Sequence, residues 1–172
     1  MSDRAANIAH LAELIRDIRV AMLTTIARDG RLVSRPLATQ EAEFDGELWF
    51  ATEHDSGKVA EIAANPHVNI AYASPGRNLY VSVAGRASVV RDRDRIEALW
   101  SPAMEMFFHK GEGDWSLCMI RVEADSAEYW EGPGTIFGKA LYLALSAVTN
   151  DPARLSENAL LDLQGASPRT AG

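Results

Sequence analysis

The spacing of hydrophobic residues along the chain predicts one N-terminal helix followed by a series of short strands. Between residues 8 and 18, isoleucine and leucine recur every three or four positions, which is the period of an amphipathic helix. The period then changes to a β-branched apolar run over residues 20–26, and Asp29-Gly30 predicts a tight turn into a second strand over residues 31–39. We expect the helix to form a lid on a barrel made by these and later strands.

Later segments repeat the strand pattern and add connecting helices. Asp45-Gly46 predicts another tight turn before a strand over residues 47–52, and a helix over residues 58–64 ends at Asn65-Pro66 because proline cannot continue it. Further strands are predicted over residues 68–73, 79–90, 115–122 and 127–130, with a bulge at Gly85, and further helices over residues 92–100, 102–111 and 139–148.

These elements predict a mainly β fold, an antiparallel β-barrel with an N-terminal helix and connecting helices. A chain of 172 residues with 47% hydrophobic residues suits one folded domain over residues 1–172. We expect its core at about residues 8–148 and a polar tail over residues 150–172. A small barrel has little room inside, so a ligand of more than a few atoms is expected on the rim or at a subunit interface.

Charge and composition exclude several classes of partner. The net charge of −7 is spread over mixed runs such as residues 91–95, which leaves no basic face to follow a nucleic-acid backbone. The N-terminus lacks an apolar signal core and the longest apolar run, residues 140–148, is too short to span a bilayer, so we expect a soluble, cytoplasmic protein with no membrane partner. The lone Cys118 is interpreted as a core residue, and the histidines are too far apart to predict a metal site.

Two segments place a cation beside hydroxyl groups where a strand meets a turn or a helix. Arg35 precedes Pro36, which removes a backbone donor and predicts an edge or bulged strand. Lys58 lies in the first turn of its predicted helix, where free N–H groups and the helix dipole favour an anion, and Ser56 adds a hydroxyl. The pair suits a phosphate-bearing ligand, although residue types alone leave ordinary solvated cations as the simpler interpretation.

The order of short motifs along residues 10–132 resembles a known family. The matching segments are Asp29-Gly30, Ser34-Arg35-Pro36-Leu37, Asp45-Gly46, Leu48-Trp49-Phe50, Thr52, Ser56 with Lys58, Asn65-Pro66, Tyr80-Val81-Ser82, Leu99-Trp100-Ser101-Pro102 and Ala127-Glu128-Tyr129-Trp130. Each segment is short, but their order is similar to that of the general stress protein 26 family. This family belongs to the pyridoxamine 5′-phosphate oxidase-like split barrels that bind FMN.

The resemblance implies a flavin site. Arg35 and Lys58 would hold the FMN phosphate, and Ser56 and Thr52 would donate hydroxyl hydrogen bonds to it. The isoalloxazine or ribityl region would be lined by Pro36, Leu37, Trp49 and Phe50. The flavin of this fold lies at the two-fold interface of a homodimer, so Tyr80, Ser82, Trp100 and Trp130 are candidates to reach it from the partner chain. Core packing is an equal alternative for each tryptophan.

No residue pattern identifies a catalytic group, and the catalytic residues stay unknown. The tail after residue 153 offers only Arg154 and Arg169 and no aromatic residue, so it lacks the tryptophan-and-arginine segment with which the oxidases proper grip pyridoxal phosphate. The resemblance therefore implies an FMN-dependent oxidoreductase for an unknown small substrate rather than a true pyridoxamine 5′-phosphate oxidase. A non-catalytic flavin sensor or store remains the alternative, and FAD remains an alternative to FMN.

Overall fold

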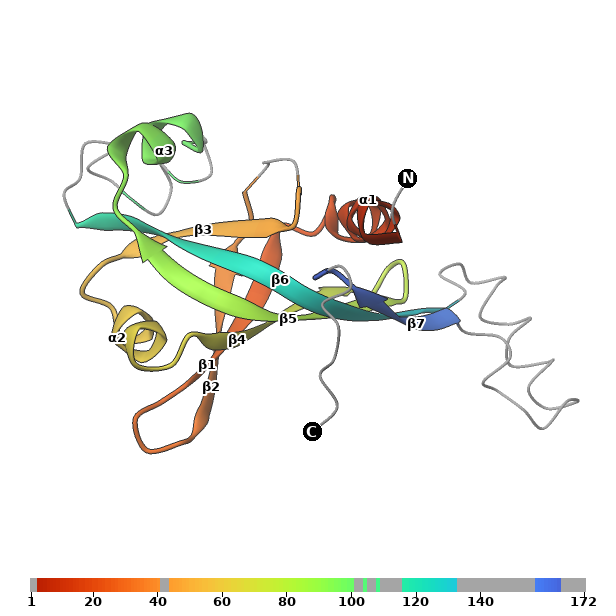
Figure 1. Cartoon of the computed structure of the whole chain (residues 1–172), viewed down its shortest axis with the longest axis horizontal. Coiled ribbons are helices and arrows are strands. Elements are labelled where there is room, and N and C mark those ends of the chain that lie inside the picture. The colour runs from red at the N-terminus through yellow and green to blue at the C-terminus, as the bar shows by residue number, and fades with distance from the viewer. Residues whose placement is uncertain are drawn as a thin grey trace, which may run out of the picture.

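The computed structural model describes residues 3–40, 44–100, 104, 108, 116–132 and 157–164. Its elements are α1 (Asp3–Ile15), β1 (Val20–Ile26), β2 (Leu32–Ala38), β3 (Glu47–Glu53), α2 (Gly57–Ala64), β4 (His67–Ser74), β5 (Leu79–Val90), α3 (Arg93–Ala98), β6 (Leu117–Glu131) and β7 (Glu157–Asp162). The described strands form one antiparallel sheet in the order β2-β1-β4-β5-β6-β3, with β7 paired to β6 (Figure 1). The predicted mainly β, split-barrel fold is confirmed.

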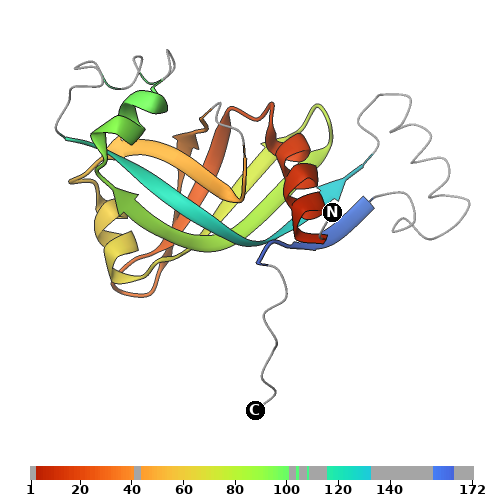
Figure 2. The same cartoon turned by 45° about the horizontal axis from the view of Figure 1, so that its top comes forward.

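Alternation along each strand places one face in a shared core. In β5, Leu79, Val81 and Val83 are buried, whereas Tyr80 and the other residues between them face outward, because successive side chains of a strand point to opposite faces. Leucine and isoleucine side chains of α1 enter the same core, so this helix packs against one end of the rolled sheet (Figure 2). The helix α2 lies at the other end.

The two ends of the strand order, β2 and β3, form a seam in the barrel. Among the described strands, β2 pairs only with β1, and β3 pairs only with β6. The two edge strands nevertheless come into contact, so the sheet curls almost closed without joining its edges. The edge position predicted for the strand that carries Pro36 is confirmed.

The predicted strands over residues 115–122 and 127–130 are wrong as separate elements, because they form one continuous strand, β6. Asp125 and Ser126 are poor strand formers, but β6 pairs with β5 on both sides of them. On its other side β6 pairs first with β3 and then with β7. The predicted bulge is confirmed: the β5 register shifts between Ala84 and Gly85, where a Cβ atom would clash with the backbone carbonyl of Glu123.

The strand β7 is not predicted from the sequence. It lies within residues 150–172, which are expected to form a polar tail. Leu161 and Leu163 are buried in the main core. Arg4 and Asn7 of α1 donate side-chain hydrogen bonds of 2.8 and 2.9 Å to the carbonyls of Leu163 and Asp162, respectively. These contacts fasten the N-terminal helix to the last described strand.

Other predictions have mixed outcomes. Cys118 is fully buried, as predicted, and burial raises the pKa of its thiol. The helix predicted over residues 92–100 is present as α3, and the Asp92 carboxylate caps it by accepting a hydrogen bond from the Arg95 backbone N–H. The helices predicted over residues 102–111 and 139–148 fall largely or wholly outside the described residues. No helix in the described part of the chain is both long and apolar enough to cross a bilayer.

Candidate functional site

A cavity of about 300 Å³ lies along the seam between β2 and β3 and is called the seam cavity here. It is lined by Pro36, Leu37, Ala38, Gln40, Ala51, Thr52, Glu53, Lys58, Met104 and Phe108. Four of the predicted flavin residues, namely Pro36, Leu37, Thr52 and Lys58, are therefore brought together, although they come from three elements. Barrel closure achieves this by placing the two edge strands beside the first turn of α2.

Lys58 is the cation of the seam cavity. It is half-buried, and within the described part of the chain no hydrogen bond or ion pair engages its ammonium group. Burial is the main cause that lowers its pKa, and the charge of Arg35 lowers it further. A desolvated ammonium beside a second cation is a favourable position for an anion, which would offset both effects.

Ser56 supplies a free hydroxyl at the start of α2. Its backbone is extended, as expected for an N-cap residue, but its side chain makes no capping hydrogen bond. The Ser56 Oγ atom is buried and has no partner among the described residues. Since buried polar atoms are normally hydrogen-bonded and N-cap hydroxyls normally bond the first turn, this atom is available to a ligand. The free hydroxyl, the lysine and the helix N-terminus together fit a phosphate group.

Arg35 is next to this site but does not line the seam cavity. Its Nη1 donates to Thr25 Oγ1 at 2.9 Å, and its Nη2 donates to Glu61 Oε2 at 2.9 Å. The Thr25 hydroxyl also donates to Glu61 Oε2, at 2.5 Å. This hydrogen bond is the main cause that lowers the pKa of the Glu61 carboxyl, and Arg35 and Lys58 lower it further against the effect of burial. Arg35 is thus held by the Glu61 carboxylate.

The predicted ring contacts from β3 have different positions. The Phe50 side chain is buried in the main core and does not line the seam cavity. Trp49 and Trp100 both pack against a second core cluster beneath α3, and the Arg95 guanidinium lies 4.5 Å from the centre of the Trp49 ring. Neither tryptophan lines the seam cavity.

The remaining candidates, Tyr80, Ser82 and Trp130, lie on the outer face of the sheet. Tyr80 and Trp130 are paired across β5 and β6 and are 44% and 39% exposed. The Ser82 hydroxyl accepts a hydrogen bond of 2.8 Å from Asn69. Because β5 and β6 are separated from the seam by other strands, these residues do not meet Lys58 within one chain.

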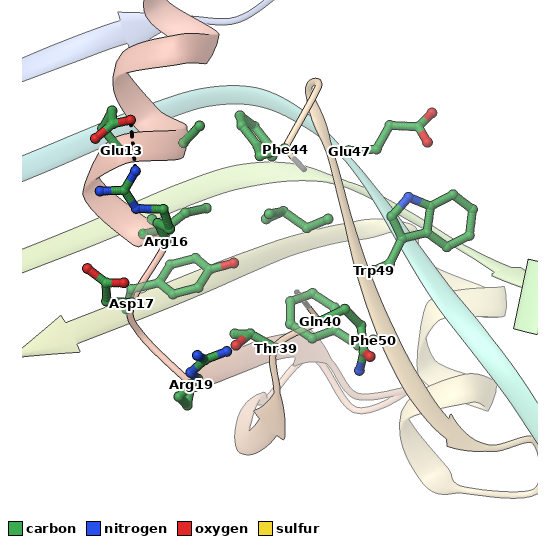
Figure 3. Close-up of a pocket in the computed structure, with 14 residues that line it drawn as sticks. Glu13, Arg16, Asp17, Arg19, Thr39, Gln40, Phe44, Glu47, Trp49 and Phe50 are labelled. Carbon is green, nitrogen blue, oxygen red and sulfur yellow. Dashed lines mark hydrogen bonds and ion pairs between the residues drawn. The ribbon is translucent and has the colours of Figure 1, made fainter. Parts of the chain in front are cut away.

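A second cavity of about 510 Å³ lies between the end of α1 and the start of β3 (Figure 3). Arg16 and Arg19 lie on one side of it and Trp49 on the other. Gln40 lines both cavities, and its side-chain oxygen is buried without a partner among the described residues. The two cavities therefore lie on either side of Gln40.

Thr25, Gln40 and Glu61 are site residues that their sequence context does not reveal. Thr25 sits in an apolar strand, and Glu61 is an acidic residue in a short helix, which is an ordinary solvent-facing pattern. A weak signal exists only for Glu61, which follows Lys58 by three residues and so shares its side of the helix.

Comparisons with known proteins identify the family of the chain. Residues 6–153 match the model of the family described as pyridoxamine 5′-phosphate oxidase like. The chain is 29% identical over 160 residues to protein bli-3 of Neurospora crassa, with 87% of this chain and 77% of that protein covered.

Solved structures show the same fold. A structure from Jannaschia sp. CCS1 with a provisional general stress protein 26 designation has a TM-score of 0.71 and 23% identity, covering 92% of this chain and 99% of that one. The general stress FMN/FAD binding protein of Xanthomonas citri has a TM-score of 0.63 and 26% identity, covering 73% of this chain and 89% of that one. From the family match and the shared split barrel, this chain belongs to the pyridoxamine 5′-phosphate oxidase-like family.

Proposed function

We propose that this protein binds FMN and uses it as an oxidoreductase on a small substrate. The observation that carries the proposal is the free anion site at the start of α2, where Lys58 and the buried Ser56 Oγ have no partner among the described residues. The relative from Xanthomonas citri, described as an FMN/FAD binding protein, supports the same ligand class.

In this proposal each group has a defined role. Lys58, Ser56 and the free donors of α2 bind the flavin phosphate, and Arg35 completes the positive charge around it. Pro36, Leu37 and Thr52 border the ribityl chain and ring along the seam. Bound FMN supplies the electron or hydride transfer, whereas the chain supplies position and charge balance.

A homodimer with the flavin at its interface is part of the proposal. The outer face of the sheet exposes Val20, Met22, Tyr80 and Trp130, and these large apolar side chains suit burial against a second copy of the chain. In such a dimer, Tyr80 and Ser82 of one chain would reach the flavin that lies at the seam of the other chain. The cytoplasmic location stays a prediction.

The alternative is a flavin-binding protein without turnover. Among the described lining residues of the seam cavity, Lys58 and Glu53 are the ionisable ones, and Lys58 is already assigned to the phosphate. That leaves the exposed Glu53 as the one ionisable residue of the described lining that could act as a general acid or base. FAD would use the same phosphate contacts through its inner phosphate.

The test is to purify the protein, measure its visible spectrum, add FMN or FAD, and then add NADH or NADPH under anaerobic conditions. Yellow colour that bleaches on addition of the reduced nucleotide supports the oxidoreductase. Colour without bleaching by either nucleotide favours the binding protein. A colourless protein that takes up neither flavin contradicts both functions.

A further inference from the structure

The side chains of Thr25, Arg35 and Glu61 form a closed hydrogen-bonded triangle beside the anion site. Arg35 donates to Thr25 and to Glu61, and Thr25 donates to the same oxygen of Glu61 that accepts from Arg35. The three residues come from β1, β2 and α2, so the triangle joins both strands of the β1–β2 pair to the helix that carries Lys58. Thr25 is fully buried, and the Arg35 and Glu61 side chains are 22% and 18% exposed.

The position of Glu61 is unexpected for an anion site. Its pKa is lowered, so it is a carboxylate at neutral pH, and it stands beside the two cations that we assign to the flavin phosphate. By Coulomb's law alone, a carboxylate at this position repels a phosphate, and its removal should tighten binding. A favourable role for Glu61 must therefore come from geometry.

We propose that Glu61 and Thr25 are positioning residues that fix the Arg35 guanidinium for the flavin phosphate. This inference rests on the proposed FMN-binding function. Arginine has more N–H donors than the two bonds to Thr25 and Glu61 use, so a guanidinium held in this way keeps donors for a phosphate. A guanidinium fixed before binding loses less conformational freedom when the ligand arrives.

The triangle also fixes the distance between the two cations. Glu61 follows Lys58 by three residues on α2, so both side chains project from neighbouring positions of one short helix. A bond from Glu61 to Arg35 therefore holds α2 against β2. The Glu61 carboxylate also reduces the repulsion between Arg35 and Lys58, since it acts on both cations.

The experiment compares the affinities of the full-length protein for FMN and for riboflavin, which lacks the phosphate. The variants are Glu61→Ala, Glu61→Gln, Thr25→Val and Thr25→Ser, and binding is followed by quenching of flavin fluorescence. Glu61→Ala and Thr25→Val should each weaken FMN binding by about tenfold or more and leave riboflavin binding unchanged. Glu61→Gln keeps an oxygen that can accept both bonds, and Thr25→Ser keeps the hydroxyl, so both should bind FMN within about threefold of the wild type.

Three outcomes would overturn the inference. Unchanged or tighter FMN binding by Glu61→Ala would show that the carboxylate acts only by its charge. An equal loss for FMN and riboflavin would show a general structural role. If Glu61→Ala does not fold, the matched pair Thr25→Val and Thr25→Ser decides, and equal FMN affinities in that pair would refute positioning. A wild-type protein that binds neither flavin refutes the proposed function itself, which separates that failure from a failure of this inference.

Discussion

Replacement of Lys58 by methionine is expected to weaken FMN binding strongly. Methionine keeps the length and apolar stem of the side chain but removes its charge and donors. A hydrogen bond between charged groups contributes about 2–3 kcal/mol net when water is partly excluded, which corresponds to about 30- to 150-fold in the dissociation constant. Lys58 is half-buried, and Arg35 remains to hold the phosphate, so the loss should stay within this range.

The same substitution should not destabilise the flavin-free protein. Burial, and then the charge of Arg35, lowers the pKa of Lys58 in the folded chain. A lowered pKa means that the protonated lysine is less favourable in the folded state than in the unfolded state, so at neutral pH the charge reduces the free energy of unfolding. Methionine removes this unfavourable contribution. The melting temperature of Lys58→Met without flavin should therefore equal or exceed that of the wild type.

Two assays test this pair of expectations. Flavin fluorescence titration at fixed ionic strength gives the affinity for FMN and for riboflavin, and thermal denaturation without flavin gives the stability. Arg31→Met is the matched control, because the Arg31 side chain is 77% exposed and pairs with Asp29 outside both cavities. Wild-type FMN affinity in Lys58→Met would refute the phosphate site. A lower melting temperature would refute the account of the buried charge.

Four further changes are expected to have measurable effects. The affinity for FMN should fall on the alkaline side as the pH rises through the lowered pKa of Lys58, because the lysine loses its proton while the flavin phosphate stays dianionic. Riboflavin titrations over the same pH range are the control, and a flat FMN profile would contradict the assignment. Gly85→Ala should lower the free energy of unfolding by about 1–3 kcal/mol, because the added Cβ meets the Glu123 carbonyl. Leu161→Ala should lower it by about 2–4 kcal/mol, because the smaller side chain leaves a cavity under β7. Chemical denaturation measures both, and wild-type stability of either variant would contradict the packing account given for it. Trp130→Glu should convert the proposed homodimer to a monomer, because it places a charge on an exposed apolar residue of the proposed interface. Sedimentation measures the oligomeric state, and circular dichroism checks that the fold is kept. A sedimentation coefficient that stays at the dimer value would exclude Trp130 from the interface.

The strands up to β5 could be predicted because their signals are local. Asp29-Gly30 and Asp45-Gly46 set two turns, and both glycines have the positive φ that such turns favour. The length of β6 and the existence of β7 could not be predicted in this way. Residues 157–162 become a strand only because β6 offers them an unpaired edge after β3 has ended. That pairing depends on the curled sheet, and the segment itself carries only a short apolar run at residues 159–161.

The candidate site divides along the same line. Lys58 and Ser56 could be predicted because a helix start is a local feature with known anion chemistry. Glu61 and Thr25 could not, since neither the helix pattern nor the strand pattern says which side chain will face Arg35. Their contact is decided by the packing of α2 against β1, which joins residues 36 positions apart. Likewise, Trp49 and Phe50 are adjacent in the sequence but belong to different core clusters, because alternate residues of β3 point to opposite faces.

The candidate ligand site exists because the barrel is not closed by hydrogen bonds between β2 and β3. Pro36 removes one N–H from β2, which suits a strand at the edge of a sheet. Because β2 and β3 do not pair in the described structure, residues 36–38 and 51–53 border a cavity instead of a continuous ladder. Unpaired edges normally invite association with other strands. A flavin that lies along the seam, covered by a second chain, would protect both edges, so we expect FMN binding to stabilise the split barrel at the point where its own hydrogen bonding stops.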